Sequence, residues 1–230
     1  MGNLKNIITA LILCMATTAN AVPLLQIYIE GATYDDDSET WITKESSFTL
    51  WVIANTQGPG SKGEIRDIKL VATAVNQDMS DLEITGTTTD LVTDPSIAQN
   101  PELVQSGRGD HHTLPKHGIF NEDSHWHEYV LGDMGLSDSP IGDATKNGFP
   151  EYLAGIEQNA QINAYHVEKS PYTTIHFDAY GYYGNKNKYT FVPFSHDGEA
   201  AAINEPTSIA IMLFGLIGLA VRKIRLRKRN

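Results

Sequence analysis

Cysteine is almost absent from this 230-residue sequence, and basic residues are scarce in its central part. The one cysteine, Cys14, excludes an internal disulfide framework and a structural zinc site built on cysteines. Between positions 22 and 205, ten Lys and Arg stand against 28 Asp and Glu. Because so acidic a region repels phosphate backbones, we expect no nucleic acid among the partners of the protein.

Sequence motifs of common hydrolases and calcium loops are absent as well. The chain has no G-x-S-x-G nucleophile elbow, no EF-hand spacing and no glycine–aspartate nonapeptide repeat. Ser195, His196 and Asp197 are the residue types of a hydrolytic triad, but triad members meet through the fold and seldom as sequence neighbours. We interpret residues 194–197 as the end of a strand and predict a protein without catalytic activity. An exported hydrolase acting on extracellular polysaccharide is the alternative.

The first 21 residues have the layout of a secretory signal peptide. Lys5 forms a short basic region, residues 7–15 are apolar, and Ala19-Asn20-Ala21 supplies small residues at a cleavage site. We therefore predict export and removal of residues 1–21 by signal peptidase, which leaves one extracellular domain over residues 22–203.

The C-terminal segment, residues 204–230, is typical of a membrane anchor. Residues 209–221 are uninterrupted apolar residues, and six of the next eight are Lys or Arg. This run is shorter than the roughly 20 residues that span a bilayer, but flanking residues extend it because bases can snorkel. Since basic clusters stay cytoplasmic, we expect the acidic domain outside, anchored transiently in the inner membrane by this helix.

A three-part layout marks this segment: the dipeptide Glu205-Pro206, an apolar helix rich in small residues, and a terminal basic cluster. The layout resembles the PEP-CTERM sorting tail of exported proteins in Gram-negative bacteria that make exopolysaccharide. Asn204 stands in place of the first proline of that signature. The resemblance implies that an exosortase, a membrane transpeptidase-like enzyme, recognises Glu205 and Pro206 as the sorting signal. It also implies a final location at the cell surface or in the extracellular matrix.

Several segments of the central domain are similar to a second family of exported bacterial proteins. They are residues 24–34, 48–53, 115–120, 175–180 and 193–197. These segments resemble the choice-of-anchor N proteins, which share an extracellular domain joined to different surface anchors. The resemblance implies surface display and names no reaction. Exopolysaccharide or other envelope components are the partners that such a location implies.

Alternation of apolar and polar residues predicts an all-β domain, folded as a single antiparallel β-sandwich. The alternating runs are residues 25–30, 48–53, 67–74, 174–180 and 189–194. The second run is apolar on both faces, which predicts a strand buried on both sides. Residues 94–124 are expected to form a long irregular loop, and only residues 151–156 have a weak helical pattern.

All eight histidines lie between positions 111 and 196. If residues 125–131 are extended, His125 and His127 share one face of the strand, and two such imidazoles can chelate one metal ion. Nearby acidic residues that can add oxygen ligands are Glu122, Asp123 and Glu128. If the protein binds a divalent transition metal, His125 and His127 are the ligands that we predict; otherwise these histidines have a purely structural role. The positions of His111 and His112 relative to them stay open.

Clustered acidic residues offer a second kind of metal site. Asp35, Asp36 and Asp37 follow the first predicted strand. Calcium takes six to eight oxygen ligands and is available to proteins outside the cell. We therefore predict calcium at this turn if a metal is bound there, and a solvated turn without metal as the alternative.

Two further pairs of residues are candidates for binding or chemistry. Tyr182 and Tyr183 are flanked by glycines, which predicts an exposed loop whose rings contact sugar rings, with core packing as the alternative. His176 and Asp178 share the polar face of their predicted strand. They form either a general acid–base pair or a structural hydrogen bond.

Overall fold

The computed structural model describes residues 22–87, 99–116, 120–146, 148–153, 156–186 and 188–203. The predicted signal peptide and the predicted sorting segment, with Glu205 and Pro206, lie outside these ranges. Within them, no helix is long and apolar enough to cross a membrane.

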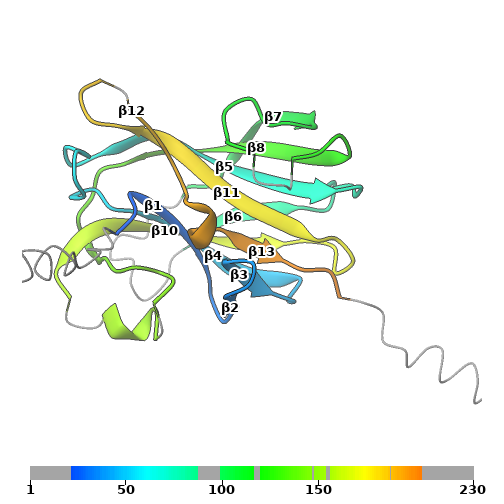
Figure 1. Ribbon diagram of the computed structural model, residues 1–230, viewed down its shortest axis with the longest axis horizontal. Helices are drawn as coiled ribbons and strands as arrows, with labels where there is room; N and C mark the ends of the chain where they lie inside the picture. The colour runs from blue at the N-terminus through cyan, green and yellow to red at the C-terminus, as the bar shows by residue number, and fades with distance from the viewer. Residues whose placement is uncertain are drawn as a thin grey trace, which may run out of the picture.

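The described residues form an all-β fold with two mainly antiparallel sheets (Figure 1). The small sheet contains β1 (Leu25–Ile29), β4 (Ser47–Ala54), β10 (Gln158–Glu168) and β6 (Glu83–Thr87) in this order, with β9 (Ser139–Pro140) paired to β10. The large sheet contains β2 (Thr33–Asp35), β3 (Thr40–Thr43), β13 (Gly198–Ala200), β11 (Ile175–Tyr183), β5 (Ile65–Val75), β8 (Ser124–Met134) and β7 (Glu102–Arg108), with β12 (Lys188–Phe191) paired to β11. The pairing of β13 with β3 is parallel.

The main core lies between the two sheets. Alternate residues of each long strand point into it, because successive side chains of a strand face opposite sides. The small sheet contributes Leu25, Ile27, Ile29, Leu50 and Val52. The large sheet contributes Ile68, Leu70, Ala72, Ile175, Phe177 and Ala179. These alternations are the ones that the sequence predicts, and the core confirms them.

The small sheet is buried on its outer face too. Trp51 and Ile53 of β4 pack there against Phe149 and Leu153, which belong to the segment before β10. The same segment contains η1 (Glu151–Leu153), a single turn of 3-10 helix. The prediction that residues 48–53 are buried on both sides is therefore confirmed, and the weak helical pattern corresponds to this one turn.

The outer face of the large sheet has a separate cover. Val71, Trp126 and Tyr180 pack there against Leu114 and Phe120, which come from the connection between β7 and β8. Buried polar side chains lie on the same face, beside these aromatic rings. This face therefore combines burial with titratable groups.

Two boundaries predicted from the sequence are wrong. Residues 94–124 are not one irregular loop, because β7 lies within them and pairs with β8. Phe194 does not end the strand that begins near Tyr189: β12 stops at Phe191, and η2 (Phe194–His196) is a 3-10 turn. Asp197 follows this turn and leads directly into β13.

Candidate functional site

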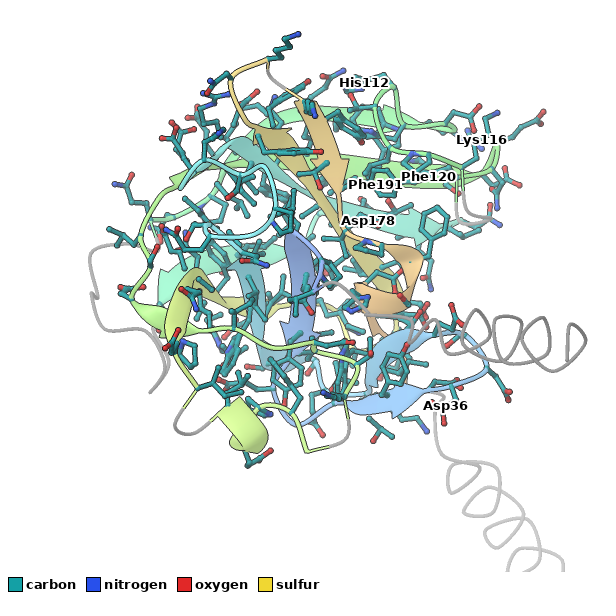
Figure 2. All side chains as sticks on the ribbon, turned by 60° about the vertical axis from the view of Figure 1, so that its left-hand side comes forward. Asp36, His112, Lys116, Phe120, Asp178 and Phe191 are labelled. Carbon is teal, nitrogen blue, oxygen red and sulfur yellow. The ribbon has the colours of Figure 1, made fainter. Side chains whose placement is uncertain are left out.

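Strand β11 carries the candidate site on its outward face. The outward side chains are His176, Asp178, Tyr180 and Tyr182, which alternate with the core residues of the same strand. The strand register places Thr73 of β5 and Glu199 of β13 on either side of His176. In Figure 2, Asp178, Phe120 and Phe191 gather in one region of the molecule, far from Asp36.

A buried group of one histidine and two carboxylates occupies the end of this face near β13. His176 Nε2 lies 3.5 Å from Asp178 Oδ2 and 3.2 Å from Asp197 Oδ2, and all three side chains are at most 8% exposed. Burial alone would lower the pKa of His176, but the two carboxylates outweigh it and raise the pKa to about 10. We call these three residues the His176 cluster.

A cavity of about 310 Å³ opens beside the His176 cluster. Its lining includes His176 itself, Thr73, Gln77 and Glu199. The residues around the cavity are therefore mostly polar, and one histidine and one glutamate are among them.

A second histidine–carboxylate group lies further along the same face. His111 Nε2 is 3.0 Å from Glu128 Oε2, and the Tyr180 hydroxyl donates a 2.8 Å hydrogen bond to the same oxygen. His111 Nδ1 accepts hydrogen bonds from the backbone N–H groups of Thr113 and Leu114. The proton of a neutral His111 ring must therefore sit on Nε2 and donate to Glu128.

The electrostatics of this second group favour a neutral ring. Burial lowers the pKa of His111, the nearby His112 lowers it further, and Glu128 offsets part of the effect. Burial and the Glu128 carboxylate both raise the pKa of Tyr180, which keeps its hydroxyl protonated as a donor. These hydrogen bonds attach the segment around His111 to the outer face of the large sheet.

His112 is the exposed member of this region. Its ring stacks on His111 at a centroid distance of 4.4 Å, its side chain is 49% exposed, and its Nε2 lies 3.8 Å from Glu128 Oε2. Figure 2 shows His112 at the surface, above the region that contains Phe120.

A row of aromatic rings continues along the edge strand β12. Ring centroids are 6.1 Å apart for Tyr182 and Tyr189, 5.7 Å for Tyr189 and Phe191, and 6.2 Å for Phe191 and Phe194. The first three side chains are half-buried, and Phe194 is 40% exposed. We call these four residues the aromatic row. It presents ring surface to solvent beside the His176 cluster.

The prediction that Tyr182 and Tyr183 lie in an exposed loop is wrong, because both belong to β11, pair with β12 and are half-buried. The structure also separates the two side chains. Tyr182 pairs with Tyr189 and joins the aromatic row. Tyr183 points to the other face of the hairpin, where the ammonium of Lys188 lies 6.0 Å from its ring centroid and Gly60 is its close neighbour. Only Tyr182 is therefore placed to act together with other rings.

His125 and His127 lie on β8 and face away from Glu128, as the alternation predicts. His125 is exposed, and His127 is half-buried with its Nδ1 3.4 Å from the Tyr129 hydroxyl. Burial lowers the pKa of His127. Within the described ranges, neither histidine belongs to a group of three potential metal ligands. Glu128 instead reaches His111 on the opposite face.

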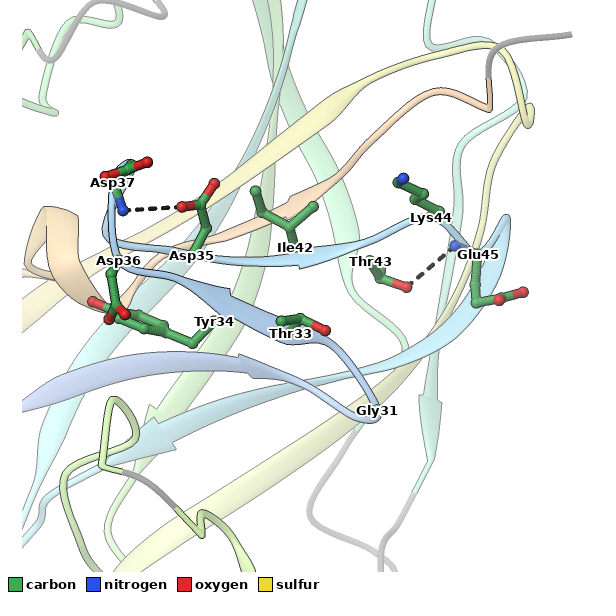
Figure 3. A pocket seen from close by; sticks show the side chains of 10 residues that line it. All are labelled: Gly31, Thr33, Tyr34, Asp35, Asp36, Asp37, Ile42, Thr43, Lys44 and Glu45. Atoms are coloured by element: carbon green, nitrogen blue, oxygen red, sulfur yellow. Dashed lines mark hydrogen bonds between the residues drawn. The ribbon is translucent and has the colours of Figure 1, made fainter. Parts of the chain in front are cut away.

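The three aspartates after β1 line an open pocket of about 800 Å³ at the β2–β3 hairpin (Figure 3). The backbone N–H of Asp37 donates to Asp35 Oδ1 at 2.9 Å, which closes the turn. Asp35 and Asp36 project to opposite sides of the hairpin in Figure 3. Lys44 and Glu45 line the far end of the pocket. This is the geometry of a solvated turn, and calcium binding there stays a prediction.

Ser195 and His196 form a hydrogen-bond chain with an aspartate, but not with their neighbour Asp197. Ser195 Oγ lies 2.8 Å from His196 Nδ1, and His196 Nε2 lies 2.9 Å from Asp143 Oδ1. Burial raises the pKa of Asp143, but hydrogen bonds from Thr145 and His196 outweigh it and lower the pKa. Asp197 turns to the His176 cluster instead.

Comparison with known proteins adds little to this geometry. No protein-family model matches the chain, and no curated protein matches it. Among solved structures, the chain is similar to the full-length major pilin SpaD from Corynebacterium diphtheriae, at 8% identity and a TM-score of 0.25. The match covers 76% of this chain and 33% of the pilin chain, so this chain spans about a third of the pilin.

Proposed function

We propose that the protein is an exported, non-catalytic component of the cell surface or extracellular matrix that binds exopolysaccharide through the aromatic row. The single observation that carries the binding part is the set of four neighbouring, partly exposed rings at the edge of the large sheet. The predicted signal peptide, the resemblance of residues 204–230 to a PEP-CTERM tail and that of the central domain to choice-of-anchor N proteins support the location.

The chemistry of the aromatic row suits a sugar polymer. Aromatic rings combine a large apolar face with limited conformational freedom, so they bind flat apolar surfaces at low entropic cost. Three of the rings sit on paired strands, which fixes their positions before a ligand arrives. The ammonium of Lys69 lies 5.6 Å from the ring of the adjacent Tyr180 and offers a polar donor beside the row.

Binding of the purified full chain to exopolysaccharide from the producing organism tests this proposal. Tyr189→Ala and Phe191→Ala should each weaken binding about tenfold, which corresponds to about 1.4 kcal/mol. Tyr172→Ala is the matched control, because this tyrosine is 57% exposed and lies outside the row. Unchanged binding in both row variants, or an equal loss in the control, would contradict the proposal.

Export and sorting need a separate measurement. Mass spectrometry of the cell-associated and extracellular fractions should find a chain that begins at Val22 and is cut near Glu205-Pro206. A tail variant that lacks the six terminal bases should change the sorting but leave the cut after Ala21 unaffected. Detection of full-length chain in the cytoplasm alone would overturn the proposed location.

The hydrogen-bond chain of Ser195, His196 and Asp143 favours one alternative function, an exported hydrolase acting on extracellular polysaccharide. A serine hydroxyl that donates to an imidazole, itself held by a carboxylate, is the arrangement that activates a nucleophile. Release of reducing ends or acyl groups should be measured on the same polysaccharide sample. Release that disappears in Ser195→Ala would establish this alternative, and binding without release supports the non-catalytic function.

A further inference from the structure

The three ligand atoms of the His176 cluster have the spacing of a metal site. His176 Nε2 and one oxygen each of Asp178 and Asp197 lie within 4.8 Å of one another. A tetrahedral ion with bonds of about 2.1 Å separates neighbouring ligand atoms by about 3.4 Å. The two nitrogen–oxygen distances, 3.5 and 3.2 Å, fall on either side of this value. The ligands need little movement to share one ion.

The charges of the cluster also suit a divalent ion. Its two carboxylates carry two negative charges in a buried place, where uncompensated charge is costly. A protonated His176 offsets one of these charges. A divalent cation bound by a neutral His176 offsets both, and therefore neutralises the three groups taken together.

A buried oxygen of Asp197 provides an independent observation. The side chain is 3% exposed, and within the described part of the chain its Oδ1 accepts no hydrogen bond. Thr73 Oγ1, opposite His176 in the strand register, is likewise buried without a hydrogen bond to any described residue. Since buried polar atoms nearly always have partners, these two oxygens point to an ion or its bound water.

The adjoining cavity supplies room for a fourth ligand. It borders His176, and Gln77 and Glu199 line it. Three protein ligands with one open position are the arrangement that zinc adopts when it keeps a water molecule or exchanges a ligand. Glu199, the register partner of His176 on β13, is the carboxylate residue that lines the same cavity.

The second histidine group has similar spacing, since one ligand atom each of His111, His112 and Glu128 also lie within 4.8 Å of one another, but its hydrogen bonds leave less room for a metal. Both ring nitrogens of His111 already have partners: Nδ1 accepts two backbone N–H groups, and Nε2 donates to Glu128. A metal on Nε2 would have to displace that proton while Nδ1 faces two donors. The geometry therefore favours the His176 cluster over His111 and Glu128.

We propose that His176, Asp178 and Asp197 bind one divalent transition-metal ion, of which Zn²⁺ is the best fit. One imidazole and two carboxylates are typical ligands of zinc and manganese, whereas calcium prefers oxygen alone. The ion joins β11 to the turn that precedes β13. It therefore ties the C-terminal strand of the described domain to the middle of the large sheet.

Zinc binding to the purified full chain, after removal of metal with a chelator, tests this proposal. Calorimetry and elemental analysis should give one Zn²⁺ per chain, and zinc should raise the melting temperature by mass action. Asp197→Asn should weaken zinc binding by more than about 100-fold, since second-shell changes alone cost 10- to 100-fold. Glu168→Gln is the matched control, because Glu168 lies 3.2 Å from His166 in an exposed histidine–carboxylate pair.

A second measurement uses the unaltered chain, so its result does not depend on whether a variant folds. X-ray absorption of the zinc-loaded protein should show one imidazole and otherwise oxygen neighbours at about 2.0 to 2.2 Å. Absence of stoichiometric zinc, or full affinity in Asp197→Asn, would overturn the proposal. So would zinc binding that is lost in His127→Ala and kept in Asp197→Asn, because it would assign the metal to the face of β8 that carries His125.

Discussion

The side chain of Gln26 should be among the most important buried polar groups of this fold. It lies on β1, is fully buried, and spans the gap to a segment more than 100 residues away in sequence. Its Nε2 donates to the Gly142 carbonyl at 3.0 Å, and its Oε1 accepts the Ala144 N–H at 2.7 Å. Gln26→Leu keeps a similar volume but removes both hydrogen bonds.

The size of the effect follows from the groups that are left behind. Gly142 and Ala144 are themselves buried, so water does not replace the lost partner. Each unsatisfied buried group costs about 1–3 kcal/mol, and the gain from burying leucine offsets part of the total. We expect Gln26→Leu to lower the free energy of unfolding by about 2 to 5 kcal/mol.

Urea unfolding followed by tryptophan fluorescence measures this change, because all three tryptophans are buried. Gln57→Leu is the matched control. Gln57 Nε2 donates to Ser137 Oγ at 2.8 Å in an exposed position, so its loss should cost no more than about 0.5 kcal/mol. The reasoning is refuted if Gln26→Leu costs less than about 1 kcal/mol, or if both variants lose the same amount.

Phe177→Ala should lower the free energy of unfolding by about 3–5 kcal/mol, since Phe177 is fully buried and packs edge-on against Phe48; chemical denaturation measures it. Burial lowers the pKa of His111, so below pH 6.5, its ordinary pKa, the unfolded chain binds more protons than the folded one. The free energy of unfolding should therefore fall as the pH drops below 6.5. Unfolding measured over a range of pH should show a weaker pH dependence in His111→Gln. Gly107→Ala should lower the melting temperature, because the added Cβ collides with the ring of Trp126 on the paired strand.

The strands of the core could be predicted because the order of residues along one strand decides which side chains point to the same face. In β5 and β11, alternate apolar residues enter the core between the sheets, and the period of two follows from strand geometry alone. The double burial of β4 was visible for the same reason, since both of its faces are apolar. No knowledge of neighbouring strands was needed for these assignments.

Strand β7 could not be predicted on that basis. Six of its seven residues are exposed, so it shows no alternation between a solvent-exposed face and a buried face. β7 is a strand because its backbone pairs with β8, and the residue pattern of β7 does not indicate this pairing. An edge strand of this kind looks like a polar loop in sequence.

In the candidate site, too, residues of one strand could be predicted from the sequence, whereas their partners from other segments could not. The i, i+2 spacing of His176 and Asp178 was readable, and the structure places both in one cluster. Their partner Asp197 comes from the turn before β13, and only the pairing of β13 with β11 brings it close. Likewise, alternation placed Glu128 opposite His127, but nothing in the sequence selects His111 as its partner.

The two faces of β11 have different surroundings, so substitutions can separate their effects. Ile175 and Phe177 point into the core, where truncation creates a cavity and lowers stability. His176 and Tyr182 point to the outer face, which does not pack against the small sheet. The His176 cluster and the aromatic row lie on that face. A change such as Tyr182→Ala removes a half-exposed ring and leaves the core intact, so it should weaken ligand binding with little loss of stability. If inner-face and outer-face variants instead changed stability and binding in parallel, the outer face would be a covering layer rather than a binding surface.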